Sequence, residues 1–205
     1  MNVVRGGLLV ALIMLTGCAT RPTAPGAGVN WARRAESLMQ LPGWEASGRI
    51  AVKSGRQGGQ GNIRWIQRGA DARIGLHGPF GVGAYQIDWT EDNFVVTGKA
   101  GEVTMTYAGP DAVERFMKDQ FGWTFPARSM RYWILGIADP RFPSQSQFDA
   151  DGWFTVLRQN GWVVTYGRFV QEQGRWMPHK IIMERDQVRV KLVVDRWRWP
   201  PERPD

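Results

Sequence analysis

Short segments in which apolar and polar residues alternate, separated by glycine-rich turns, constrain the fold of this chain most strongly. Residues 44–53 place Trp44, Ala46, Ile50 and Val52 on one face and polar residues on the other. The same pattern recurs at 63–67, 74–77, 82–89, 94–97, 103–107, 153–158, 162–166, 176–185 and 188–197. Period-two alternation indicates strands with one buried face, and short turns favour antiparallel neighbours. The sequence therefore predicts a mainly β fold of about 10–11 antiparallel strands.

Helical spacing replaces this alternation in three places. The first helix is expected after Asn30, a good N-cap residue, and before Pro42. The second is expected to begin at residues 110–111, and the third to follow Pro126 and to stop near Gly136. Proline and polar residues at 138–150 indicate a loop.

Turn residues predict how the strands connect. The glycine-rich stretch at 55–61 is interpreted as a turn between the first two strands. Asn160-Gly161 separates two apolar runs and can supply the two positive φ angles of a type I′ turn, so it predicts a hairpin.

The first seventeen residues have the features of a cleaved export signal. Arg5 gives a positive charge, and residues 8–15 (LLVALIML) form an apolar run. That run is far below the roughly 20 residues that span a bilayer, so we interpret it as a signal peptide. Residues 15–18 (LTGC) resemble the bacterial lipobox, and Cys18 is the only cysteine in the chain. The resemblance implies cleavage before Cys18, lipid on its thiol and acylation of the new amino terminus.

The remaining chain divides into a tether, one domain and a tail. Residues 18–30 are rich in proline and glycine and are expected to be a flexible tether behind the lipidated Cys18. Residues 31–199 are expected to form a single domain, and residues 200–205 a frayed end. In bacterial lipoproteins with such a signal, Asp after the cysteine commonly favours the inner membrane, so Ala19 favours the outer membrane.

The residues offer no recognisable catalytic or metal-binding pattern. One cysteine excludes an internal disulfide and a cysteine-cluster zinc site, and His77 and His179 match no H-E-x-x-H pair. Gly98-Lys99 lacks the rest of a phosphate-binding loop, and no serine is flanked as G-x-S-x-G. Asp149 and Asp151 suit a turn. We therefore expect no catalytic residue, no metal, no cofactor and no enzymatic activity.

Positive charge is concentrated toward the C-terminus. The net charge of the chain is +7, and Arg or Lys occupies positions 180, 185, 189, 191, 196 and 198, interleaved with Trp197 and Trp199. Basic residues among aromatic ones also occur in nucleic-acid-binding proteins, but an exported lipoprotein does not meet nucleic acid. We interpret the basic stretch as the solvated outer face of an edge strand.

The segment Gly78-Pro79-Phe80-Gly81 predicts a sharp turn with an apolar residue at its tip. An exposed Phe forgoes about 1.5–3 kcal/mol of burial, so soluble proteins usually avoid one. Either Phe80 projects from the turn or it folds back onto the sheet, and the residues alone leave both alternatives open.

Seven segments carry a family resemblance by their order and spacing. They are the lipobox ending at Cys18, Trp44 with residues 48–52 (GRIAV), residues 74–83 (IGLHGPFGVG), residues 132–136 (YWILG), Asp139-Pro140, residues 161–166 (GWVVTY), and Met177-Pro178 before a basic last strand. Together they resemble the LolB family of bacterial outer-membrane lipoprotein receptors.

The resemblance implies a fold, a location and a function. It implies an open, unclosed β-barrel with a helical lid over an apolar cavity, anchored by lipid at the periplasmic face of the outer membrane. It implies that the protein accepts lipoproteins from a soluble periplasmic carrier, LolA, and inserts them into the outer membrane. The expected partners are this carrier, acylated cargo and outer-membrane lipid, with no nucleic acid and with the protein as a monomer.

The resemblance also implies site residues. An exposed apolar residue, usually Leu in the family, helps to place cargo in the bilayer, and the motif puts Phe80 at that position in a loop of Gly78, Pro79, Phe80 and Gly81. Candidate cavity residues, each of which can also be ordinary core, are Trp65, Ile74, Leu76, Tyr85, Ile87 and Met105 from the strands and Phe116, Met117, Trp133 and Ile134 from the lid.

Two other functions remain as alternatives. One is a lipoprotein that binds lipid or another apolar ligand without transferring cargo. The other is an envelope hydrolase, which the absent catalytic motifs disfavour. If the family resemblance holds, the net positive charge is expected to help dock an anionic surface of the carrier.

Overall fold

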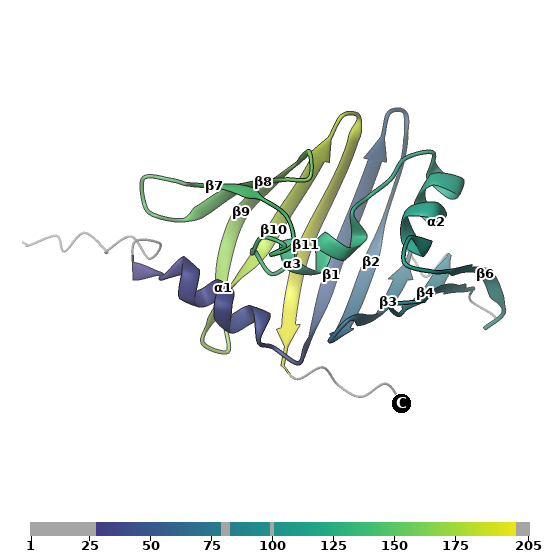
Figure 1. Ribbon diagram of the computed structural model, residues 1–205, viewed down its shortest axis with the longest axis horizontal. Helices are drawn as coiled ribbons and strands as arrows, with labels where there is room; N and C mark the ends of the chain where they lie inside the picture. The colour runs from purple at the N-terminus through teal and green to yellow at the C-terminus, as the bar shows by residue number, and fades with distance from the viewer. Residues whose placement is uncertain (1–27, 79–82, 99–100, 200–205) are drawn as a thin grey trace, which may run out of the picture.

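A computed structural model describes residues 28–78, 83–98 and 101–199, and its main feature is one open antiparallel sheet (Figure 1). The sheet has eleven strands in the order β6-β5-β4-β3-β2-β1-β11-β10-β9-β8-β7, so its two end strands, β6 and β7, are not neighbours. The strands are β1 Gly43–Ser54, β2 Gln57–Arg68, β3 Asp71–His77, β4 Ala84–Trp89, β5 Asn93–Thr97, β6 Val103–Ala108, β7 Ser144–Phe148, β8 Phe154–Gln159, β9 Trp162–Glu172, β10 Arg175–Arg185 and β11 Val188–Arg198. The mainly β, unclosed architecture is confirmed.

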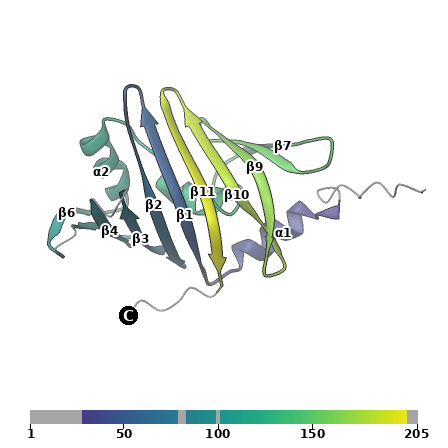
Figure 2. The ribbon, with the colours of Figure 1, turned by 180° about the vertical axis from the view of Figure 1, so that it is seen from behind.

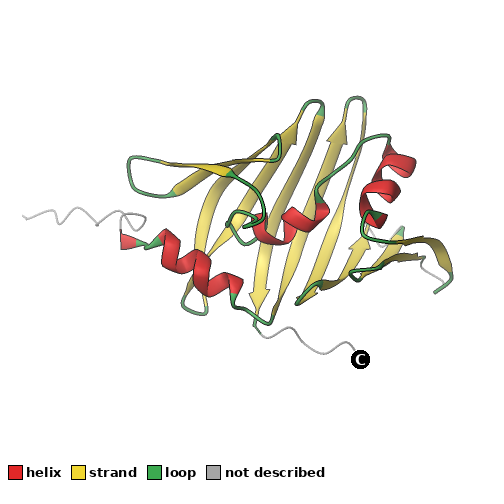
Figure 3. Ribbon diagram, in the orientation of Figure 1, coloured by secondary structure: helices red, strands yellow, loops and turns green. Residues whose placement is uncertain are grey.

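Three helices lie on the same side of this sheet. They are α1 (Trp31–Met39), α2 (Ala112–Phe121) and α3 (Ala127–Trp133). Figure 1 shows them in front of the strands, and Figure 3 shows the same arrangement coloured by element type. Seen from behind in Figure 2, the strands face the viewer with no helix over them. We call the face under the helices the inner face and the opposite face the outer face.

Alternation along the strands sorts apolar side chains onto the inner face. Along β1, Trp44 and Ala46 lie opposite Gln67 and Trp65 of β2, and all four are buried. The polar face of β1 carries Glu45, which pairs with Arg64 at 2.8 Å on the outer side. The inner face and the helices together bury one contiguous hydrophobic core.

The two halves of the sheet meet only where the first strand pairs with the last one. Strands β1 to β6 follow one another as a meander, as do β7 to β11, and β1 pairs with β11 to join the halves. The β1–β11 register shifts between Ser47 and Gly48. At this irregularity the strands approach so closely that a Cβ on Gly48 would lie 2.0 Å from the carbonyl oxygen of Val193.

The expected helices and the hairpin turn are confirmed. The Asn30 side chain accepts a hydrogen bond from the backbone N–H of Arg33 at 2.9 Å and caps α1. After α3 the chain turns at Gly136, whose φ is 71°. Asn160 and Gly161 have φ of 53° and 75°, as a type I′ turn between β8 and β9 requires.

Three expectations were wrong, each for a physical reason. Most of the expected turn at 55–61 belongs to β2, where residues 57–61 pair with β1. Gly61 serves close strand packing and not a turn, since a Cβ there would come within 2.5 Å of the carbonyl oxygen of His77 on β3. The expected loop at 138–150 contains β7, whose residues are all exposed and so show no alternation. The basic segment at 188–198 is the interior strand β11, which pairs on both sides, so it is not an edge strand.

Within the described part of the chain, no helix is long and apolar enough to cross a membrane.

The contact at Gly48 generates a prediction about stability. Replacement Gly48→Ala is expected to lower the free energy of unfolding by at least about 2 kcal/mol, because the new methyl group collides with rigid backbone. Gly59→Ala on β2 is the matched control, since a Cβ there meets nothing within 4 Å. Urea unfolding of both variants measures the difference. Equal stabilities would show that β11 can shift away from β1 at little cost.

Candidate functional site

The ten apolar residues expected to line a cavity differ sharply in exposure. All lie on the inner face or in the helical cover that packs over it. Trp65, Phe116, Trp133 and Ile134 are buried, with at most 8% of their surface exposed. Ile74, Leu76, Ile87, Met105 and Met117 are partly buried against the core, and Tyr85 is 47% exposed. The inner face is therefore closed over its central strands and less covered toward β3–β6.

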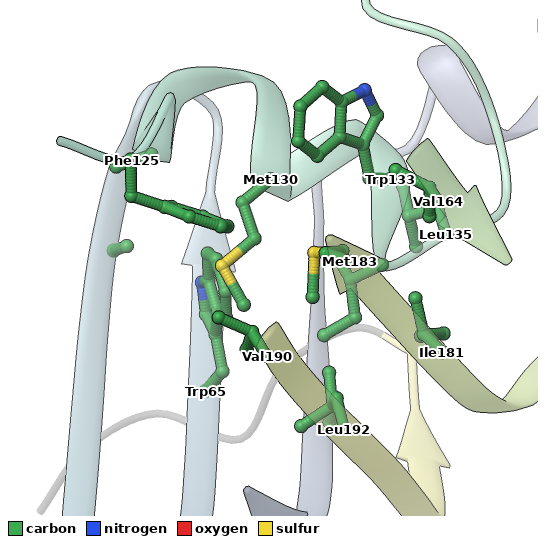
Figure 4. Close-up of a cluster of buried hydrophobic side chains, with 14 of the residues drawn as sticks. Trp65, Phe125, Met130, Trp133, Leu135, Val164, Ile181, Met183, Val190 and Leu192 are labelled. Carbon is green, nitrogen blue, oxygen red and sulfur yellow. The ribbon is translucent and has the colours of Figure 1, made fainter. Parts of the chain in front are cut away.

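Side chains from the α3 region fill the space over the central strands. Figure 4 shows Met130 reaching from α3 toward Trp65 of β2 and Met183 of β10. Phe125, just before α3, meets the Trp162 ring edge-on with centroids 4.8 Å apart. Trp133 and Met183 are completely buried. This part of the cover is a packed core.

Among the described helices, α2 is the one that covers the half of the inner face formed by β3 to β6 (Figure 1). Phe116 of α2 packs on Phe94 and Tyr107, with centroid distances of 4.7 and 5.8 Å. At the margin of this cover Val103 is 61% exposed and Phe121 is 49% exposed. We call the partly covered set of Ile74, Leu76, Tyr85, Ile87, Met105 and Met117 the apolar wing.

The β3–β4 hairpin carries the segment expected to insert into membranes. The backbone N–H of Gly78 donates to the carbonyl oxygen of Gly83 at 3.3 Å and closes the base of the hairpin. Leu76 and Tyr85 of the apolar wing lie opposite each other directly before this base. Of the expected insertion loop only Gly78 is described, and Pro79, Phe80 and Gly81 lie outside the described residues, as does Cys18.

A buried polar network holds α3 and the loop after it on β8. The Gln159 side-chain oxygen accepts hydrogen bonds from the Trp133 indole at 2.8 Å and from the backbone N–H of Asp139 at 2.9 Å. The Asp139 carboxylate, itself fully buried, accepts from the Ser129 hydroxyl at 2.7 Å and from the Arg141 guanidinium at 2.6 Å. These hydrogen bonds therefore link α3, β8 and the loop that carries Asp139 and Arg141.

The electrostatics of Asp139 follow from these bonds. Burial alone would raise the pKa of the Asp139 carboxyl, but the hydrogen bonds from Arg141 and Ser129 outweigh burial and lower that pKa. The carboxylate is thus ionised and fully engaged at neutral pH.

Arg34 of α1 fastens the turn that directly follows α3. Its guanidinium donates to the carbonyl oxygens of Trp176, Gly136 and Leu135 at 2.7, 3.0 and 2.6 Å. Burial lowers the pKa of Arg34 to about 10, an effect that the nearby Tyr166 opposes, so the group stays charged at neutral pH.

Tyr166 adds a further hold on α3. Its hydroxyl donates to the carbonyl oxygen of Trp133 at 3.0 Å, and burial raises the pKa of this hydroxyl. The C-terminal end of α3 is therefore bound from both α1 and β9.

The ends of α2 are built differently. The chain enters and leaves this helix through Gly109 and Gly122, whose φ angles are 94° and 74°. At its start, Arg115 donates to the carbonyl oxygen of Ala108 and pairs with Asp111 at 3.3 Å, and Arg128 donates to the carbonyl oxygens of Glu91 and Pro110. These contacts lie near the protein surface. The helical cover thus has a firmly bonded half, α3, and a half held mainly by apolar packing, α2.

Gln159 and Asp139, which hold α3 and the following loop in place, were not identified by the sequence analysis. Gln159 is buried on β8 and lies opposite the buried Trp162 of β9, and Asp139 precedes a proline. A polar residue at a position that the alternation assigns to the core was the available signal, because buried polar groups need partners.

The described residues also form two shallow hollows on the outer face. The larger, about 230 Å³, is lined by residues of β2, β3 and β4 that include Arg73 and Asp88, which pair at 2.6 Å. The smaller, about 140 Å³, adjoins it and includes Arg64 and His77. Neither lies under the helices. Among residues 28–78, 83–98 and 101–199, no three His, Cys, Asp or Glu side chains gather as a metal site.

Comparison with known proteins matches most of the chain. A family model described as "Outer membrane lipoprotein LolB" matches residues 42–197. A protein named outer-membrane lipoprotein LolB from Pseudomonas aeruginosa is 28% identical over 198 residues, which covers 92% of each chain. The protein of the same name from Chromohalobacter salexigens is 29% identical over 197 residues, covering 93% of this chain and 88% of its own.

A solved structure supports the fold. The crystal structure of a LolA superfamily protein from Nitrosomonas europaea superposes with a TM-score of 0.52, covering 83% of this chain and 92% of its own at 8% sequence identity. This likeness concerns the fold alone.

The buried network around Asp139 predicts that a single substitution there will strongly lower the stability of the protein. Asp139→Asn is expected to lower the free energy of unfolding by about 2 kcal/mol, because an amide nitrogen then faces donors in a buried site. Asp195→Asn is the control, since its pair with Arg49 is 48% and 64% exposed and should change stability by less than about 0.5 kcal/mol.

Comparison of the wild type with Asp139→Asn at different pH values also tests the pKa of Asp139. A carboxyl whose pKa is lower in the folded than in the unfolded protein stabilises the fold above the unfolded pKa, about 3.9, and loses that contribution as the pH falls through the folded pKa. The difference in stability between wild type and Asp139→Asn should therefore be constant near neutral pH and shrink below about pH 4. A difference independent of pH down to acid unfolding would contradict the lowered pKa.

Proposed function

This chain belongs to the LolB family of outer-membrane lipoproteins, and from this premise we propose that it accepts acylated lipoproteins from a soluble periplasmic carrier and inserts them into the outer membrane. The apolar wing carries the proposal. It is an apolar surface that is continuous with the core, lies beneath a helix held mainly by packing, and has a margin where Tyr85 is 47% exposed. Contiguous exposed apolar surface in a folded domain commonly marks a site for an apolar partner.

Acyl chains suit such a surface because apolar contact is non-directional. Each buried methylene contributes about 0.8 kcal/mol, so a chain of a dozen carbons can be held without specific hydrogen bonds. Met105 and Met117 add side chains that adapt to different shapes. Transfer needs only that cargo is better buried here than in the carrier, so no nucleotide is required.

Opening of the site is assigned to α2. Hydrogen bonds from Trp133 to Gln159 and from Tyr166 to Trp133 fix α3, and Arg34 fixes the residues directly after it, so movement of α3 would leave several buried polar groups without partners. Displacing α2 exposes mainly apolar contacts of Phe116, which an acyl chain can replace. The glycines at 109 and 122 flank the moving helix.

The N-terminal segment supplies the anchor in this proposal. Residues 1–17 are removed, Cys18 carries the lipid, and residues 18–30 tether the domain of residues 31–199, which is followed by the tail at 200–205. Stable anchoring takes two or more acyl chains, as the lipobox implies. We assign a non-catalytic role to this domain, with the carrier and its cargo as partners.

The apolar wing can be tested in a transfer assay with a purified carrier that holds an acylated lipoprotein, without nucleotide. Tyr85→Glu is expected to reduce acceptance of cargo about tenfold, because a carboxylate at the margin of the wing is costly to desolvate. Thr106→Glu is the matched control, since it adds the same charge on the exposed outer face of β6. Equal acceptance by both variants would remove the wing from the path of the cargo. A wild-type chain that binds acylated cargo but takes none from the carrier would favour a ligand-binding lipoprotein without transfer.

The proposed insertion loop is tested by separating acceptance from release. Phe80→Glu is expected to accept cargo normally and to release it into liposomes at least about tenfold more slowly, because a charge replaces the apolar tip. Phe80→Leu should retain release. The free energy of unfolding of both variants should stay within about 0.5 kcal/mol of wild type. A clearly destabilised Phe80→Glu variant would mean instead that Phe80 packs onto the sheet.

A further inference from the structure

Basic side chains gather on the outer face of the three central strands. Inner-face positions of β11 hold the buried residues Val190 and Leu192, so the positions between them point outward. Outward positions on β1, β10 and β11 carry Arg49, Lys53, Lys180, Arg189, Lys191 and Arg196, which we call the basic outer face. Figure 2 views the sheet from this side.

Few acidic residues balance this surface. Arg49 pairs with Asp195 at 3.3 Å, and Arg189 with Glu184 at 3.0 Å. No ion pair within the described residues involves the other four, namely Lys53, Lys180, Lys191 and Arg196. The basic outer face therefore keeps a net positive charge.

The arrangement costs stability. Lys53 of β1 lies directly opposite Arg189 of β11 in the register. Like charges directly opposite one another on antiparallel strands are destabilising. Between the basic side chains stand small or apolar residues, Ala51, Ile182 and Val193, which are only partly buried. Packing of the fold does not account for this surface, whereas an anionic surface lying against it would.

We propose that the basic outer face docks on the anionic phospholipid headgroups of the membrane that anchors the chain. Nine residues lie between Cys18 and Gly28, so the ten steps along this tether reach at most about 35 Å, and the domain always stays near lipid. An anionic lipid surface attracts each Lys or Arg that comes within about 10 Å of it, with roughly a fivefold gain in binding for each. Docking in this way orients the domain on its membrane.

The position of the helices favours lipid over an anionic carrier as the occupant. The helical cover and the apolar wing lie on the inner face, on the far side of the sheet from the basic outer face (Figures 1 and 2). A carrier bound to the basic outer face would have the sheet between its cargo and the apolar wing, a step that rests on the proposed function. A membrane on that face leaves the helical cover accessible.

The test uses residues 18–205 with Cys18→Ala, which removes the site of the proposed lipid anchor and lies outside the described helices and strands. Binding is measured by co-sedimentation with vesicles of phosphatidylcholine alone or with about 30 mol % phosphatidylglycerol. We expect binding to the anionic vesicles only, and loss of binding as salt rises to about 0.5 M. Neither the carrier nor cargo is present, so failure of the transfer proposal would not affect this result.

Two double variants with equal change in charge locate the contact. Lys180→Gln with Lys191→Gln, on the basic outer face, is expected to weaken binding about twenty-five-fold. Arg33→Gln with Lys118→Gln removes two exposed charges from α1 and α2 on the opposite side and should change binding less than about threefold. Equal weakening by both pairs, or no binding to anionic vesicles, would overturn the proposal. It would also be overturned if the Lys180/Lys191 variant bound vesicles normally but lost affinity for the carrier. Thermal unfolding confirms that each variant is folded.

Discussion

Pairing of β1 with β11 is the constraint on which the rest of this structure depends. It is the one place where the meander of β1–β6 meets the meander of β7–β11. The close approach at Gly48 permits the irregularity in this pairing. Without the pairing, neither half would place its apolar face under a common set of helices. The core that contains Trp65 from one half and Met183 from the other exists only because the halves are joined.

The joined sheet allows its helical cover to serve two purposes. Over the central strands, α3 packs tightly and is hydrogen bonded to Gln159 and Tyr166, and Arg34 binds the turn directly after it. Over β3–β6, α2 lies on apolar side chains that remain partly exposed. The cover therefore has one half held by polar bonds and one half held mainly by apolar contacts. A domain of this kind can offer apolar surface to a ligand while its core remains intact.

Local patterns in the sequence predict much of this fold, and long-range contacts account for what they miss. Alternation identified most strands and helical spacing all three helices, because each reflects one buried face of a single element. The need for glycine at position 61 comes from the close approach of His77 on β3, and the strand at Ser144–Phe148 depends on its partner β8. The same limit applies to the candidate site. Apolar residues of the inner face were identified from their alternation, but which of them are fully buried depends on how α2 and α3 divide the cover.

An open sheet leaves two strands with unused backbone hydrogen-bonding groups, and these edges invite a second copy to continue the sheet. Both edges of this protein carry a register irregularity, between Val96 and Thr97 in the β5–β6 pair and between Gln147 and Phe148 in the β7–β8 pair. Bulges increase local twist, which limits how many consecutive bonds an incoming strand can form. The structure thereby keeps the openness of the sheet while resisting polymerisation along its edges, a hazard that closed barrels do not face.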